Sequence, residues 1–159
     1  MKKMYAWVFI VMGLFCTLAV ACSKDDDKKE EKKLYKVTNA PMTGAQENPA
    51  NASAATGSFD ATYNPESKEL TITVRWQGLT GNATLMHIHG PAARGVNAGV
   101  LHNFATLFSS TASGSFTTKF IINGTTEKEE DLLAGKWYVN IHTAAFGGGE
   151  IRGQIELTY

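Results

Sequence analysis

Hydrophobic and polar residues alternate along most of the chain after residue 33. In ELTITVRW (residues 69–76) every second side chain is apolar, and the same period of two occurs in GSFDATY (57–63) and KWYVNIH (136–142). Successive side chains of a β-strand point to opposite faces, so this alternation predicts half-buried strands. Similar segments, separated by turns rich in glycine, asparagine and proline, cover residues 34–40, 83–89, 113–122 and 149–159. We therefore expect an all-β fold, an antiparallel Greek-key sandwich or barrel of about seven to eight strands.

One segment departs from this alternation. In TTEKEEDLLAG, Thr126 and Glu129 have the spacing of a capping box, Leu132 and Leu133 provide apolar contacts, and Gly135 provides a stop. These signals predict one short helix between two strands.

Three of the four histidines fall on the polar side of the alternation. In KWYVNIH the apolar face contains Trp137, and His142 shares the opposite face with Asn140. In ATLMHIH, His87 and His89 point away from the face of the apolar residues beside them. We therefore expect these three imidazoles on an outward-facing polar surface and not in the hydrophobic core. There they either form a site or hydrogen-bond to their neighbours.

The first 21 residues have the pattern of a lipoprotein signal peptide. Lys2 and Lys3 precede an apolar stretch over residues 4–20, which ends in LAVAC. The stretch is short for a membrane span and ends in small residues. The pattern predicts that Cys22 becomes the acylated first residue of the mature protein, although Leu18 stands one place further back than in the usual lipobox. An ordinary cleaved signal peptide and a single N-terminal helix anchor are the alternatives.

Residues 22–33 are charged and nearly devoid of apolar side chains, so they read as a tether between the lipid and a single domain at 34–159. The SKDDD at its start resembles the export signal by which some Gram-negative bacteria send lipoproteins to the cell surface. The alternative is a solvated linker. We expect an outer-membrane lipoprotein, either periplasmic or surface-exposed.

The composition of residues 34–159 excludes several classes of function. Eight lysines and arginines against ten aspartates and glutamates leave no basic stripe, so nucleic-acid binding is not expected. The two cysteines, Cys16 and Cys22, precede the domain, so no disulfide framework holds it. No nucleophile elbow or phosphate-binding loop is present, because GGG at 147–149 reads as a turn before the last strand. The sequence therefore assigns no reaction and favours a protein that is not an enzyme.

A set of motifs in a fixed order resembles the CHRD domain, a family named for its occurrence in chordin and also found in bacterial secreted and lipid-anchored proteins. The resemblance covers about residues 35–157. It implies an all-β extracytoplasmic domain and no known reaction. One departure is TAAFGGGEIRG, because a proline often stands where this chain has Gly147 or Gly148. The motifs are GAQENP (44–49), MHIHGPA (86–92), G-x-x-AGVL (95–101), GKWYVNIHT (135–143) and GGGEIRGQI (147–155).

The histidines also have a weaker resemblance to copper,zinc superoxide dismutase, a Greek-key barrel that holds copper on its outer face. The resemblance implies metal ligands at an H-x-H strand (His87 and His89), at a histidine after a glycine-containing loop (His102) and at a late strand (His142), with Arg152 beside the metal to steer anions. The histidines of a zinc site, the cysteine pair and the electrostatic loop are missing.

Two functions therefore stay open. The first is a lipid-anchored CHRD module of binding or structural type, with an extracellular or periplasmic protein or glycan as its partner. The second is a copper or zinc site, since imidazole suits both ions. In that case Glu150 or Asn140 would accept a hydrogen bond from the second ring nitrogen of a ligand, as metal-bound histidines usually require. On the first reading Arg152 would only pair with Glu150 on the polar face.

Overall fold

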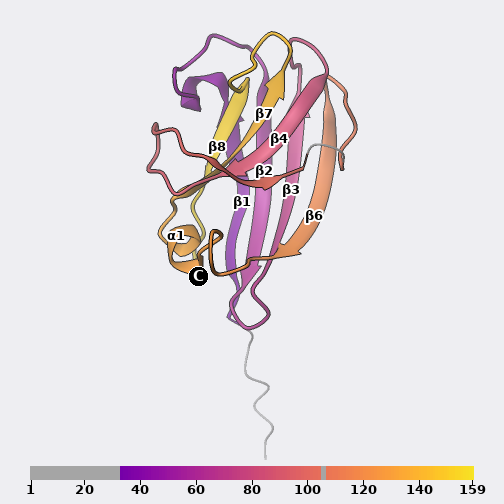
Figure 1. The fold of residues 1–159 in the computed structure, drawn as a ribbon. Coiled ribbons are helices and arrows are strands. Elements are labelled where there is room, and N and C mark those ends of the chain that lie inside the picture. The colour runs from indigo at the N-terminus through magenta and orange to yellow at the C-terminus, as the bar shows by residue number, and fades with distance from the viewer. Residues whose placement is uncertain (1–32, 105–106) are drawn as a thin grey trace, which may run out of the picture. The chain divides into compact units, whose positions relative to one another are not determined.

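A computed structural model describes residues 33–104 and 107–159 (Figure 1). The proposed signal peptide, Cys22 and the tether up to residue 32 lie outside the described residues. Within the described part no helix has the length and apolar character needed to cross a membrane. The elements in chain order are β1 (Tyr35–Thr43), the 3-10 turn η1 (Gly44–Gln46), β2 (Thr56–Asn64), β3 (Glu69–Gln77), β4 (Ala83–His89), β5 (Val100–Asn103), β6 (Gly114–Ile121), α1 (Glu129–Leu133), β7 (Trp137–Thr143) and β8 (Ile151–Ile155).

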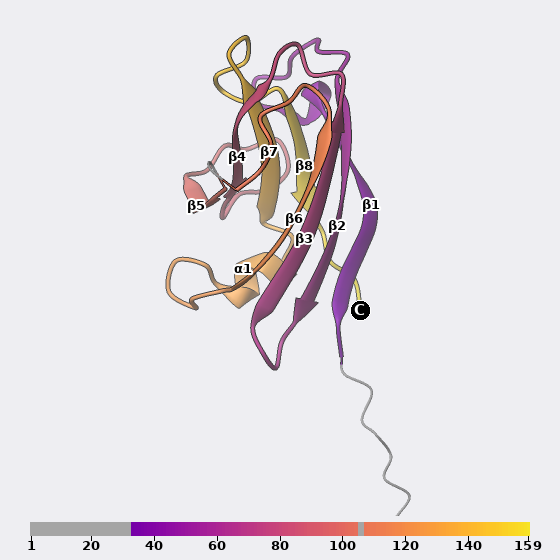
Figure 2. The same cartoon turned by 90° about the vertical axis from the view of Figure 1, so that its right-hand side faces the viewer.

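The predicted all-β antiparallel fold is confirmed. The eight strands form one sheet in the order β5-β4-β7-β8-β1-β2-β3-β6, and every pairing between neighbours is antiparallel. The order β8-β1-β2-β3 places a late strand beside the first of three consecutive strands, as in a Greek key. The sheet curls, so that β4 and β7 face β2 and β3 across the interior (Figure 2).

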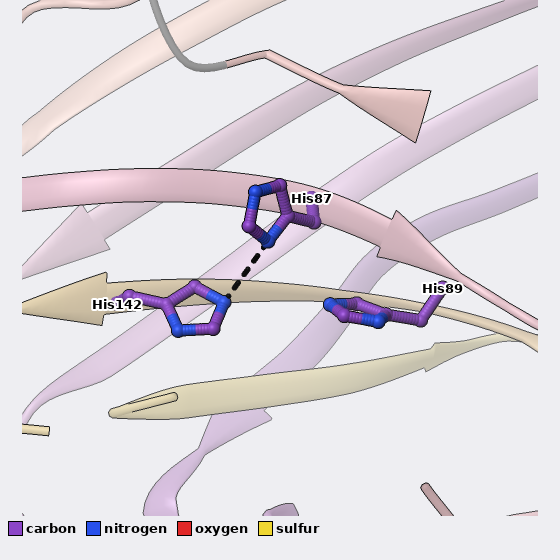
Figure 3. Close-up of side chains that lie close together, drawn as sticks. All are labelled: His87, His89 and His142. Carbon is purple, nitrogen blue, oxygen red and sulfur yellow. Dashed lines mark hydrogen bonds between the residues drawn. The ribbon is translucent and has the colours of Figure 1, made fainter. Parts of the chain in front are cut away.

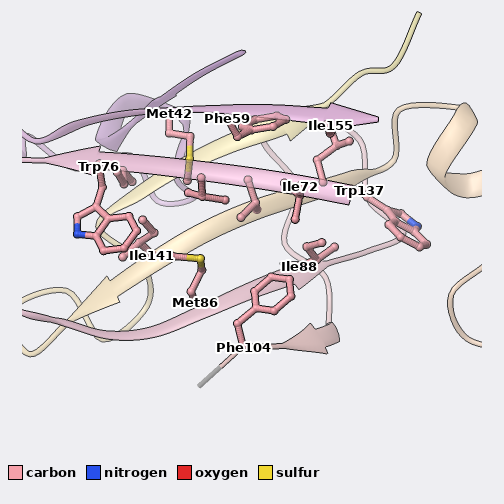
Figure 4. Close-up of a cluster of buried hydrophobic side chains, with 14 of the residues drawn as sticks. Met42, Phe59, Ile72, Trp76, Met86, Ile88, Phe104, Trp137, Ile141 and Ile155 are labelled. Carbon is pink, nitrogen blue, oxygen red and sulfur yellow. The ribbon is translucent and has the colours of Figure 1, made fainter. Parts of the chain in front are cut away.

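The core fills the inside of this curl with the apolar side of each alternation. Phe59 and Ile72 come from one half of the sheet, and Met86, Ile88 and Ile141 come from the other (Figure 4). All five are fully buried. The apolar faces predicted for residues 69–76 and 136–142 are therefore confirmed, because each strand turns only one face toward the interior.

A glycine and a tryptophan from two of the family-like motifs meet at one edge of this core. A Cβ atom on Gly90 would lie 2.8 Å from Trp137 Cδ1 and 3.0 Å from the Lys136 carbonyl oxygen. Real Cβ atoms do not approach neighbours this closely, so a side chain at position 90 would displace the fully buried Trp137. The glycine of HIHG is thus required by the tryptophan of GKWYVNIH.

The predicted helix is present but shorter, and its predicted capping box is wrong. α1 begins after Lys128, and no side chain caps it. Thr126 instead belongs to a turn in which Asn123 Oδ1 accepts hydrogen bonds from the backbone N–H groups of residues 125, 126 and 127. Asn123 Nδ2 also donates to Thr126 Oγ1 at 3.0 Å, so the threonine hydroxyl is engaged in this turn and does not cap the helix.

Candidate metal centre

Three histidines converge on the face of the sheet opposite to the core. His87 and His89 lie on β4, and His142 lies on the adjacent strand β7 (Figure 3). The register pairs His87 with Asn140 and His89 with Tyr138, which brings the four polar side chains to one side of neighbouring strands. One ring nitrogen from each histidine lies within 4.8 Å of the others. The three rings therefore present nitrogen atoms to a common point.

The inner nitrogens of the rings contact one another and Asn140. His87 Nδ1 lies 3.1 Å from His142 Nε2, as the dashed line in Figure 3 marks. Asn140 Oδ1 lies 3.1 Å from His89 Nε2 and 3.1 Å from His142 Nε2. These distances are in the range of hydrogen bonds, so the three imidazoles and the Asn140 amide form one hydrogen-bonded cluster on this face of the sheet.

The outer nitrogens of two rings donate to the backbone. His142 Nδ1 lies 2.9 Å from the carbonyl oxygen of Gly147, and His89 Nδ1 lies 3.0 Å from the carbonyl oxygen of Ala98. A carbonyl can only accept, so both Nδ1 atoms carry their proton and each Nε2 of a neutral ring carries a lone pair. Backbone carbonyls thus have the orienting role that the sequence suggested for Glu150 or Asn140.

The polar face is buried, so the expectation of an outward-facing surface is wrong. His87 and His142 are each 7% exposed, and Asn140 is 2% exposed. The β4–β5 connection (residues 90–99), here called the strap, lies over this face. The alternation separates the two faces of a strand correctly, but it does not show what covers the second face.

The strap is held to the sheet by hydrogen bonds with buried side chains. Arg152 Nη2 donates to the Val96 carbonyl at 2.8 Å, and Gln154 Nε2 donates to the Ala92 carbonyl at 3.0 Å. The Ala98 carbonyl accepts from His89. Polar side chains on β8 and β4 therefore replace the water that would otherwise solvate this face.

Arg152 is stacked against the cluster without being an ion-pair partner of Glu150. Its guanidinium carbon lies 3.3 Å from the centre of the Tyr138 ring, and the His89 ring stacks on Tyr138 with centres 4.8 Å apart. Because β7 lies between β4 and β8, the histidine and the arginine reach the tyrosine from the strands on either side. Arg152 is 1% exposed, and burial lowers the pKa of its guanidinium, whereas Tyr138 and the carboxylate of Glu47 oppose this lowering.

Glu150 belongs to a separate network at the end of β8. Its carboxylate accepts hydrogen bonds from Thr143 Oγ1 at 2.6 Å, Ser53 Oγ at 2.7 Å and the backbone of Thr80 at 2.9 Å. Burial alone would raise the pKa of Glu150, but these hydrogen bonds outweigh burial and lower it. Its contacts join the end of β7 to the η1–β2 and β3–β4 connections, and its oxygens accept from hydroxyl and amide groups.

His102 lies outside the three-histidine group. Its ring stacks on Phe120 of β6 with centres 3.8 Å apart, and its Nδ1 lies 3.0 Å from Glu127 Oε1. β5 and β6 are the two edges of the sheet, so His102 packs in the seam where the curled sheet approaches itself. The fourth position suggested by the resemblance to superoxide dismutase is therefore not joined to the others.

Glu47 is a buried group of this region to which the sequence assigned no role. It lies in the GAQENP motif, is 7% exposed, and has one carboxylate oxygen, Oε1, with no hydrogen-bond partner among the described residues. Burial raises its pKa to about 7, against the opposing charge of Arg152 and the Asn140 side chain. A Cβ atom at Gly149 would overlap this carboxylate, so the glycine leaves room for it.

Burial also lowers the pKa values of the three clustered histidines. Loss of solvation lowers the pKa of His87 to about 4, with further lowering from His142 and His89, and it lowers the pKa of His89 and His142. The neutral, lone-pair-bearing form of each ring is therefore favoured at neutral pH.

Replacing Glu47 with glutamine is expected to change how stability depends on pH. The folded-state pKa of Glu47 lies above its unfolded value of 4.5. Its contribution to the free energy of unfolding is therefore full below pH 4.5 and is lost as the pH rises through about 7. Glutamine does not titrate and escapes this loss. The free energy of unfolding of Glu47→Gln, relative to that of the unmodified protein, should therefore rise by up to about 3 kcal/mol from pH 4 to pH 8. Urea unfolding at both pH values measures this, and a difference that does not vary with pH would contradict it.

A cleft of about 290 Å³ lies beside the cluster at one end of the sheet. Two connections form it, residues 47–51 after η1 and residues 145–149 between β7 and β8. Glu47 is part of its wall, and the Gly147 carbonyl on its other side holds His142. The cleft and the histidine cluster thus share structural elements.

Comparison with known families gives one match. The model of the CHRD domain family matches residues 38–155, more than half of the chain. This range contains the three clustered histidines, Glu47, the strap and Arg152. No curated protein matches the chain, and no solved structure matches it.

Proposed function

The chain belongs to the CHRD domain family, and on this premise we propose that it is a binding module without a reaction of its own, held to the outer membrane by a lipid on Cys22. Membership of the family supports a binding or structural role. The lipid anchor, the outer-membrane location and the partner are proposed beyond what family membership supports. The partner we propose is an extracellular or periplasmic protein or glycan.

The position of the cleft relative to the start of the domain carries this proposal. β1 begins at Tyr35, next to the C-terminal Tyr159, and the cleft segment 47–51 follows the other end of β1 (Figure 1). Nine residues of strand separate the two ends by about 27 Å. A domain tethered through the residues before Tyr35 would therefore hold its cleft away from the point of attachment.

The lining of the cleft suits a neutral, polar ligand. It offers the amide side chain of Asn48, the ring of Phe146 and the backbone of the glycine run at 147–149. The Asn51 amide instead ties the two walls together, because its Nδ2 donates to the Gly149 carbonyl. Amides and backbone groups hydrogen-bond hydroxyl and amide groups, and an aromatic ring packs against apolar surface. A glycan or an extended peptide segment presents both kinds of group.

Filling the cleft should remove binding. No atom lies within 4 Å of a Cβ built on Gly148, so Gly148→Trp is expected to fold and to place its indole in or over the cleft. The matched control is Gly81→Trp in the β3–β4 connection, which is equally open and does not line the cleft. We expect binding to a glycan array, or to cross-linked envelope proteins, to be lost in the first variant and kept in the second. Equal signals from both variants, or none from the unmodified protein in either assay, would contradict the proposal.

A further inference from the structure

The histidine cluster has more lone pairs than protons. His89 and His142 each direct a lone pair inward, because their Nδ1 protons are used on the carbonyls of Ala98 and Gly147. Asn140 Oδ1 faces both of these nitrogens at 3.1 Å and is also only an acceptor. A neutral His87 can supply one proton, from Nδ1 to His142 Nε2. Three acceptors, two of them on the buried residues His142 and Asn140, therefore share at most one donor within the cluster.

Such a group of acceptors costs free energy unless something positive lies among them. Buried polar atoms are nearly always satisfied, and facing lone pairs repel one another. Arg152, the nearest buried cation, is occupied by Val96 and Asn97 of the strap and by the Tyr138 ring. With the Asn140 amide oxygen directed at both rings, a metal cation is the remaining group that matches the arrangement.

The geometry is close to that of a coordinated ion. Ligand nitrogens at 2.0–2.1 Å from a tetrahedral ion lie about 3.3 Å from each other. The contact between His87 Nδ1 and His142 Nε2 is 3.1 Å, and all three inner nitrogens lie within 4.8 Å (Figure 3). The strap carbonyl at Ala98 and the Gly147 carbonyl already hold two outer nitrogens, as in metal sites with oriented ligands.

We propose that His87, His89 and His142 bind one divalent ion of the copper–zinc class through three imidazole nitrogens, with a fourth position for water or a ligand. This site is additional to the binding role proposed above and does not depend on it. Imidazole donors suit both ions, and the general order of affinities places copper(II) above zinc. Three histidines with a free position is also an arrangement that zinc adopts in proteins.

The test is a metal titration of the full-length chain. Both cysteines are replaced, as Cys16→Ser and Cys22→Ser, so that thiols do not contribute, and the protein is purified in mild detergent. Titration with copper(II) and with zinc, each in competition with a chelator of known affinity, should show one ion per chain with a dissociation constant below micromolar. Copper(II) should bind more tightly than zinc. The electron paramagnetic resonance spectrum of the copper form should show three imidazole nitrogens.

Two variants and a matched control locate the site. His142→Gln and His87→Gln should each weaken binding at least 100-fold, whereas His102→Gln, which removes a histidine of the β5–β6 seam, should leave it unchanged. The spectrum of the unmodified protein tests the proposal even if a cluster variant fails to fold. Absence of stoichiometric binding tighter than micromolar, or an equal loss in His102→Gln, would overturn it. The Asn140 amide would then be turned round, with its NH₂ group donating to both rings and closing the network without an ion.

Discussion

Replacing Cys22 with serine is expected to abolish both lipid labelling and membrane retention of the protein. A thiol is needed for acylation, and the short apolar stretch before it ends in small residues and not in the flanks of a stop-transfer segment. A single acyl chain gives only marginal membrane binding, so a stable anchor requires the multiple chains that a lipoprotein cysteine carries. Metabolic labelling with a fatty-acid analogue and fractionation of the envelope measure the two effects.

Cys16→Ser is the matched control for this experiment. Cys16 lies inside the segment that we expect to be removed, so its replacement should leave labelling and retention unchanged. If Cys22→Ser remains in the membrane while its label is lost, the N-terminal segment is a helix anchor. If both variants are cleaved and released from the membrane, the N-terminal segment is an ordinary signal peptide.

Replacing Arg152 with alanine is expected to lower the free energy of unfolding by about 3 kcal/mol. The substitution leaves the Val96 carbonyl and the Asn97 side chain without their donor and removes the guanidinium from the Tyr138 ring. It also leaves Glu47 buried without its positive neighbour. Losing one member of a buried charged arrangement costs several kcal/mol, because the remaining polar groups stay desolvated. Urea unfolding measures the loss, and hydrogen exchange should show faster opening of the strap.

Arg75→Ala separates this effect from the loss of any arginine. Arg75 pairs with Asp60 at 2.7 Å, but the two side chains are 47% and 36% exposed. Water solvates both charges when the pair is broken, so we expect a loss below about 1 kcal/mol. A cost for Arg152→Ala no larger than that for Arg75→Ala would show that the strap does not depend on the guanidinium.

The local pattern of the chain was sufficient for the fold class and for the two faces of each strand. A strand alternates its side chains whatever surrounds it, so Phe59, Ile72 and Ile141 could be assigned to the core from spacing alone. The same rule placed His87 and His142 on the opposite face, which is correct. The capping-box prediction failed at Thr126, because the Asn123 side chain, which lies outside the motif, engages the threonine hydroxyl.

The sequence by itself therefore determined that this is an antiparallel β domain in which His87, His89 and His142 avoid the core face. Only the tertiary structure decided that β4 and β7 are neighbours, that the strap buries their polar face, and that His102 lies in the seam with Phe120. The same holds for Glu47, which reaches the cluster from a distant motif. The physical reason is range: alternation arises within a strand, whereas convergence and burial arise from pairing and covering between segments far apart in the chain.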